Sequence, residues 1–181
     1  MGKLLSDSEI ENIRMEILAL LKSTHRDGVD NVIDYLDSSG FFHAPSSVNR
    51  HHNWKGGLAQ HCLGVCNVAL ALDKSLPRDS IIIAGILHDV CKASKLYVSQ
   101  DGVIHHNSIH IKGHGCRSIR LLDDCGLKMS DDERRAIRWH MGGHHAKEAD
   151  LPEVEMVRQS GLWRVIHDAD RIDASGKKQI P

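Results

Sequence analysis

The sequence lacks the features that mark proteins that bind long nucleic acid, secreted proteins and membrane proteins. Its 181 residues carry a formal net charge of −1, so no overall basic field points to long nucleic acid or to an anionic membrane. Residues 1–21 mix charges into their apolar positions, and the longest apolar run is too short to span a bilayer, so we expect neither a signal peptide nor a membrane span. Internal repeats, low-complexity tracts and linkers are also missing. A chain of this length predicts one domain, residues 1–181, with a substantial core.

Paired cysteines are missing too. The sequence has five cysteines, an odd number, and no Cys-x-x-Cys motif. Both observations argue against a disulfide scaffold and a zinc ribbon. The pattern predicts a reduced, cytoplasmic protein in which most cysteines are small buried apolar residues. Strand signals are few, so we predict an all-α fold, a helical bundle with at most one short β-hairpin. That hairpin would pair Tyr97–Val98 with Val103–Ile104.

Helical periodicity and capping signals predict seven helices. They are expected over residues 6–22, 28–38, 56–74, 80–92, 117–122, 130–141 and 161–174. Ser6 or Ser8 could cap the first helix. Ser130 and Glu133 have the spacing of a capping box at the start of the sixth.

Histidine is present in unusual number. The 14 histidines occur singly and in pairs rather than in a tag-like tract, which favours a metal site. The nearly unbroken apolar run from Ser80 to Lys92 ends in adjacent His88 and Asp89. Protein should cover such a helix on all sides, and a buried imidazole and carboxylate are costly unless something satisfies them. A bound cation would satisfy both.

Further polar residues on the inner side of the predicted helices follow one another at intervals of 26–30 residues. The set is His61, His88, Asp89, His114, His140 and Asp170. The interval is about one helix plus its return, so a bundle can bring them to one place. Imidazoles and carboxylates without thiolates suit Mn, Fe, Ni, Co or Zn in a site that is open to water.

Six ligands exceed what one open site needs, so we predict two metal ions that share Asp89. His61, His88 and Asp170 would complete the first site. His114 and His140 would complete the second. Two ions held in this way can generate a bridging hydroxide and polarise a phosphoryl oxygen.

Five motifs, in order, resemble those of the HD-domain metal-dependent phosphohydrolase superfamily. They are HHNWKGGLAQH, GILHDVCK, KGHGCRSIRLL, AIRWHMGG and HDADRIDA. The motifs are most similar to small bacterial HD hydrolases related to the HD half of a 3′→5′ exoribonuclease family, over about residues 28–174. The resemblance implies a helical HD fold. It also carries over the six residues named above as metal ligands.

The resemblance leaves two ligand positions open. His144 and His145 follow His140, and related patterns often have a paired histidine here. Asp168 and Asp173 compete with Asp170, although Asp170 fits both the helix face and the motif.

Four further residues near the six predicted metal ligands can be given roles in substrate binding or in the pocket. Lys92 matches a lysine often found in the family, and we expect it to contact a phosphate. Arg117 is a second candidate for substrate binding. His51 and His52 are interpreted as residues of a loop or of the rim of the pocket rather than as ligands.

The predicted function is hydrolysis of a phosphate ester, with a nucleotide as the favoured substrate. In this hypothesis Asp89 holds the ions whose hydroxide attacks phosphorus, and Lys92 or Arg117 offsets the developing charge. One alternative is a 3′→5′ exonuclease on short RNA or DNA, and another is a non-catalytic module that binds a nucleotide or metal. A di-iron oxygenase is a third. No membrane partner is expected, and a homodimer is suggested only by the frequency of homodimers among soluble proteins.

Overall fold

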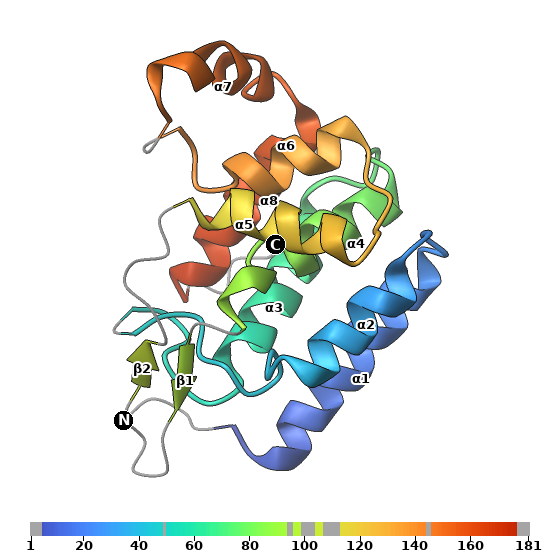
Figure 1. Cartoon of the computed structure of the whole chain (residues 1–181), viewed down its shortest axis with the longest axis vertical. Helices are drawn as coiled ribbons and strands as arrows, with labels where there is room; N and C mark the ends of the chain where they lie inside the picture. The colour runs from blue at the N-terminus through green and yellow to red at the C-terminus, as the bar shows by residue number, and fades with distance from the viewer. Residues whose placement is uncertain are drawn as a thin grey trace.

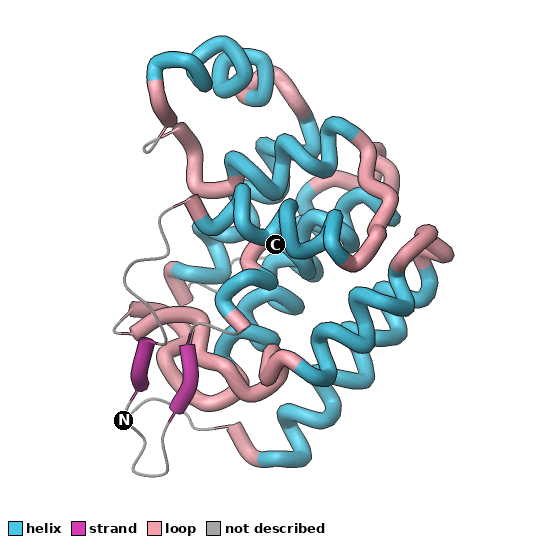
Figure 2. Tube along the Cα trace, viewed as in Figure 1, coloured by secondary structure: helices cyan, strands magenta, loops and turns pink. Residues whose placement is uncertain are grey.

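The computed structural model describes residues 5–48, 50–93, 96–98, 104–106, 113–143 and 146–176. Within these ranges the chain forms eight α-helices, which dominate the fold (Figures 1 and 2). They are α1 (Asp7–Ser23), α2 (Val29–Ser38), α3 (Gly57–Leu72), α4 (Arg78–Leu87), α5 (His114–Asp124), α6 (Asp131–Trp139), α7 (Leu151–Val157) and α8 (Gly161–Ala174). Two short 3-10 helices, η1 (Val90–Lys92) and η2 (Glu148–Asp150), complete the helical part.

The predicted all-α fold with one hairpin is confirmed. Strands β1 (Leu96–Val98) and β2 (Ile104–His106) form an antiparallel pair in which Val98 is opposite Ile104. Val103, which the predicted hairpin includes, lies outside the described residues. None of the helices in the described part of the chain has the length and apolar character that crossing a bilayer requires. The assignment of residues 1–181 to one domain stays a prediction.

Both capping predictions are confirmed. Ser6 rather than Ser8 caps α1: its hydroxyl accepts from the Glu9 amide at 3.2 Å, and the Glu9 carboxylate accepts from the Ser6 amide at 2.8 Å. Ser130 and Glu133 form the same reciprocal pair at the start of α6. Each pair satisfies two backbone amides that a helix start leaves without partners.

Helix α3 is the centre of the bundle, since it packs most extensively against α4 and α8 and also contacts α1. Every residue of α4 from Ile81 to Leu87 is buried, which confirms that protein surrounds the apolar run. Gly85 lets α4 approach α3, because a Cβ at this position would lie 2.9 Å from the Cα of Cys66. All five cysteines are free, and three of them are buried.

The predicted helix over residues 80–92 is wrong at both ends. Helix α4 starts at Arg78 and ends at Leu87, so His88 is its C-cap residue. Asp89 leaves the helical conformation, with φ −112° and ψ 12°, and η1 follows. The polar pair therefore lies just beyond a buried helix end, where its side chains can turn toward other elements.

Helix α7 is not predicted by the periodicity of the sequence. Pro152 lies in its first turn, followed by Glu153, which are both favourable at a helix start. The helix is short and lies at the edge of the molecule beside α6 (Figure 1). Its Val154 and Val157 pack with Trp139 in a small apolar cluster of their own, so too few apolar positions are present to show a period.

Gly115→Ala should destabilise the protein, because the backbone of α6 lies very close to α5 at this residue. A Cβ at Gly115 would lie 2.3 Å from the carbonyl oxygen of Arg138 and 2.6 Å from that of Ile137. Backbone atoms cannot move aside as a flexible side chain can, so we expect a loss of about 1–3 kcal/mol in the free energy of unfolding. Urea denaturation would measure it. Cys116→Ala, on the exposed side of the same helix, should leave stability within about 0.5 kcal/mol, and equal effects of the two changes would contradict the prediction.

Candidate metal centre

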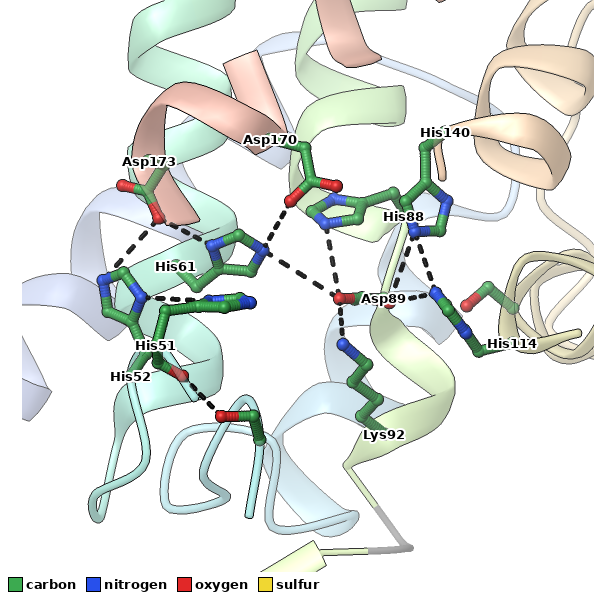
Figure 3. A network of polar contacts seen from close by, with 12 residues as sticks. His51, His52, His61, His88, Asp89, Lys92, His114, His140, Asp170 and Asp173 are labelled. Atoms are coloured by element: carbon green, nitrogen blue, oxygen red, sulfur yellow. Dashed lines mark hydrogen bonds and ion pairs between the residues drawn. The ribbon is translucent and has the colours of Figure 1, made fainter. Parts of the chain in front are cut away.

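The structure brings all six predicted ligands to one place between the helices (Figure 3). They are His61 in α3, His88 and Asp89 beyond α4, His114 at the start of α5, His140 at the C-cap of α6, and Asp170 in α8. All are buried except His114, whose side chain is 19% exposed. Their assignment as metal ligands stays a prediction.

Asp89 lies in the middle of this group, and its two carboxylate oxygens face different histidines. Oδ2 is 3.5 Å from Nε2 of His88 and 4.0 Å from Nε2 of His61. Oδ1 is 3.5 Å from Nε2 of His114 and 3.6 Å from Nε2 of His140. One carboxylate therefore stands between two pairs of imidazoles, as a bridging ligand would.

Two of the histidine rings are held by the ends of their own helices. Nδ1 of His88 is 2.8 Å from the carbonyl oxygen of Gly85, and Nδ1 of His140 is 2.7 Å from that of Ile137. A carbonyl oxygen can only accept, so each Nδ1 carries the proton and donates it. In the neutral ring this leaves the lone pair on Nε2, which points toward Asp89.

His140 is held neutral by its surroundings. Burial is the largest influence and, together with the nearby His88, lowers the pKa of His140 to about 3, although Asp89 acts in the opposite direction. Nε2 of His140 lies 3.0 Å from Nε2 of His114. Two imidazole nitrogens at this distance can share one proton or can bind a common cation.

His61 lies between two carboxylates of α8. Its Nδ1 is 2.6 Å from Oδ2 of Asp173, and its Nε2 is 3.2 Å from Oδ1 of Asp170. Burial alone would lower the pKa of His61, but the two carboxylates outweigh it and raise the pKa to about 9. The same contact with His61 and the other histidines lowers the pKa of Asp170, although burial opposes this. The site is therefore strongly polar despite its depth.

Three buried polar atoms of the site have no hydrogen-bond partner within the described part of the chain: Nε2 of His61, Nε2 of His88 and Oδ1 of Asp89. Such atoms are costly. The ligand atoms of His61, His88 and Asp170 lie within 4.8 Å of one another, and so do those of His88, Asp89 and His140. His88 belongs to both groups, but the single lone pair of its Nε2 can bind only one ion. Divalent cations held by these residues would satisfy the three atoms, so the residues fit a metal site.

Lys92 and Arg117 differ in their relation to the site. The Lys92 ammonium is 2.5 Å from Oδ2 of Asp89 (Figure 3). Burial would lower the pKa of Lys92, but Asp89 outweighs it and raises the pKa, so the ammonium stays charged. Arg117 lies on α5 one turn after His114 and is exposed. Its role in substrate binding stays a prediction, as does that of Lys92.

Three residues, His51, His52 and Asp173, lie closer to His61 than the sequence predicts. His51 and His52 do lie in a loop, but their rings are 4.8 Å and 5.4 Å from that of His61. Burial, followed by His61, lowers the pKa of His51 to about 4. Asp173 contacts Nδ1 of His61, the ring nitrogen that faces away from Asp89. Asp168, the third aspartate of α8 considered as a metal ligand, is exposed. The i,i+3 spacing of Asp170 and Asp173 was the available signal. His144 and His145 lie outside the described residues.

Comparison with known proteins agrees with this geometry. The HD domain family model matches residues 58–175, a range that contains all six predicted ligands. A dihydroneopterin 2′,3′-cyclic phosphate phosphodiesterase of Methanocaldococcus jannaschii is 32% identical over 110 residues, which are 56% of this chain and 42% of the relative. No solved structure gives a significant match.

Further relatives are 3′-5′ exoribonucleases YhaM. That of Listeria welshimeri is 27% identical over 146 residues, 75% of this chain and 44% of the relative. That of Bacillus subtilis is 30% identical over 142 residues, 74% of this chain and 43% of the relative. The chain thus spans less than half the length of each of these proteins.

Proposed function

The chain belongs to the HD domain family, and from this premise we propose that it is a metal-dependent phosphohydrolase that cleaves phosphate esters, most of all phosphodiesters of nucleotides. The observation that carries the proposal is the carboxylate of Asp89, whose two oxygens face two separate pairs of histidines. This arrangement is the one that a pair of metal ions with a shared ligand requires.

In the proposed centre Asp89 is the shared ligand. His61, His88 and Asp170 hold one ion, and His114 and His140 hold the other. Divalent ions such as Mn, Fe, Ni, Co or Zn supply Lewis acidity when bound, which activates water and offsets the charge of phosphoryl oxygens.

The residues of the chain have their own roles in this proposal. The backbone bonds at Nδ1 of His88 and His140 orient both rings, so no reorientation is needed when a substrate arrives. Lys92, already charged at the edge of the centre, binds a non-bridging phosphate oxygen as a point charge. The burial of the group limits the access of bulk water to the centre.

The names of the relatives suggest the bond that is cleaved. One is a phosphodiesterase of a 2′,3′-cyclic phosphate, and the others are exoribonucleases; RNA is also joined by phosphodiesters. We therefore favour a diester of a nucleotide or of a short oligonucleotide end. The cytoplasmic location and the homodimer stay predictions.

Product analysis tests this proposal. Metal-free protein with added Mn²⁺ would be incubated with 2′,3′-cyclic nucleotides, cyclic dinucleotides, nucleoside mono- and triphosphates and a 5′-labelled short RNA. We expect hydrolysis of at least one diester that depends on Mn²⁺ and stops when EDTA removes it. Shortening of the RNA by one nucleotide at a time would identify a 3′→5′ exonuclease. Protein that binds metal but hydrolyses nothing would instead favour a non-catalytic binding module.

A further inference from the structure

Helix α8 presents two carboxylates to the same imidazole. Asp170 and Asp173 are three residues apart and flank His61, which has no exposed surface. Asp170 lies on the side of Nε2, and Asp173 lies on the side of Nδ1 (Figure 3). The two acids therefore have different positions relative to the centre, although both belong to the same motif.

The two contacts differ in kind. The 2.6 Å contact between Nδ1 and Oδ2 of Asp173 is a hydrogen bond. Nε2 lies 3.2 Å from Asp170 but has no hydrogen-bond partner there. A metal ion that binds at Nε2 displaces the proton from this nitrogen, and the neutral imidazole that results carries a single N–H. A carboxylate that accepts this N–H at Nδ1 holds the lone pair of Nε2 toward the metal.

Gly64 makes the space for Asp173. It lies one turn after His61 on α3, and a Cβ at this position would be 2.1 Å from Oδ1 and 2.9 Å from Cγ of Asp173. Glycine within a helix is less favourable than alanine, and the close approach of the Asp173 carboxylate is the reason that glycine fits at position 64.

Asp173 also reaches a second histidine. Nε2 of His52 is 3.6 Å from the same Oδ2 that contacts His61. Nδ1 of His52 in turn lies 3.4 Å from Nδ1 of His51. The carboxylate thus connects the loop before α3 to the outer side of the centre.

We propose that Asp173 is a positioning residue of the metal centre. It accepts the Nδ1 proton of His61 and so fixes the ring with its Nε2 lone pair toward Asp89 and Asp170, while Gly64 admits the carboxylate. The inference rests on the proposed metal centre. It assigns to Asp173 an orienting role and leaves direct coordination to Asp170.

Titration of metal-free protein with Co²⁺ tests the inference, with calorimetry for affinity and the visible absorption spectrum for ligand geometry. Asp173→Asn should weaken the binding of Co²⁺ by about 10–100-fold and change the spectrum. The amide accepts more weakly than a carboxylate, and its NH₂ group can donate to Nδ1 and favour the wrong tautomer. Asp168→Asn is the matched control, because Asp168 is exposed on the same helix, and it should bind as the wild type does.

Gly64→Ala gives a second and independent test, because it displaces Asp173 without changing any titratable group. We expect a similar loss of affinity. In the double variant Gly64→Ala/Asp173→Ala the clash is gone, so thermal stability should return to that of Asp173→Ala while the affinity for Co²⁺ stays low.

The outcomes separate the inference from the proposal on which it rests. If wild-type protein binds Co²⁺ and both Asp173→Asn and Gly64→Ala bind it equally well with an unchanged spectrum, the inference is overturned. Lower stability without lower affinity would also overturn it, since that result indicates a purely structural role. If wild-type protein itself binds no Co²⁺, the proposed metal centre fails, and the inference fails with it.

Discussion

Asp89→Asn should remove nearly all hydrolytic activity and most of the metal from the protein. The amide keeps the size of the side chain but removes the negative charge that two pairs of histidines share. Metal ions contribute several kcal/mol to catalysis, and a factor of ten in rate corresponds to about 1.4 kcal/mol, so we expect turnover to fall by about 10³-fold or more. Initial rates and metal content by mass spectrometry would measure both effects.

A matched control makes this result specific. Asp168→Asn is the same chemical change at an exposed position of α8 and should alter neither rate nor metal content. Because Asp89→Asn also takes a charged partner from the half-buried Lys92, the thermal unfolding of the metal-free variant has to be measured as well. A folded Asp89→Asn protein with full metal content and full activity would refute the proposed role of Asp89.

Glu133→Ala should strongly destabilise the protein although the residue lies outside the centre. Glu133 has no exposed surface, and its carboxylate accepts two hydrogen bonds from Arg26, at 2.7 and 2.9 Å. It accepts two more, both at 2.7 Å, from the hydroxyl of Ser80 and the amide of Ser130. Removal leaves the half-buried Arg26 guanidinium without its carboxylate partner, although it still donates to the carbonyl oxygen of Lys128. Because hydrogen bonds to a charged group contribute about 1.5–3 kcal/mol, we expect a loss of about that size. Urea denaturation at pH 7 would measure the loss.

The contribution of Glu133 should also depend on pH. Burial would raise the pKa of this carboxyl, but the bonds from Arg26 and Ser80 outweigh it and hold the pKa below the ordinary value of 4.5. Since the unfolded chain then takes up the proton at higher pH than the folded one, the stabilisation is complete above about pH 4.5 and is lost as the pH falls through the folded pKa.

A pH series of urea denaturation checks the sign of this effect. The difference between wild type and Glu133→Ala should shrink as the pH falls below 4.5. Glu155→Ala removes an exposed ion pair with Arg158 and should change stability by less than about 1 kcal/mol at neutral pH. A difference that grows on acidification would contradict the assignment of the stabilisation to the ionised form.

Much of the site follows from the sequence, because its histidines stand at positions that local rules can identify. His88 follows an apolar run that could only be buried. Ser130 and Glu133 fix the start of α6, and the length of one helix then brings His140 to its end. The i,i+4 relation of Ile166 and Asp170 predicts that Asp170 faces inward, which the structure confirms.

The remaining features depend on tertiary contacts that carry no local signal. Nothing in the periodicity of α4 indicates that it ends at Leu87 rather than at Lys92. The orientation of Asp173 depends on the missing side chain of Gly64 in another helix. Likewise, His52 is an ordinary loop residue in the sequence, and only the packing of the loop against α3 brings it to Asp173.

The distribution of the six residues of the centre along the chain has a consequence for kinetics. They come from five helices or helix ends between residues 61 and 170, so the centre is complete only after nearly all long-range contacts have formed. Interactions that are absent from the folding transition state slow unfolding and leave the rate of folding almost unchanged. A metal ion bound there would therefore lengthen the lifetime of the folded protein by slowing unfolding, and would change the rate of folding little.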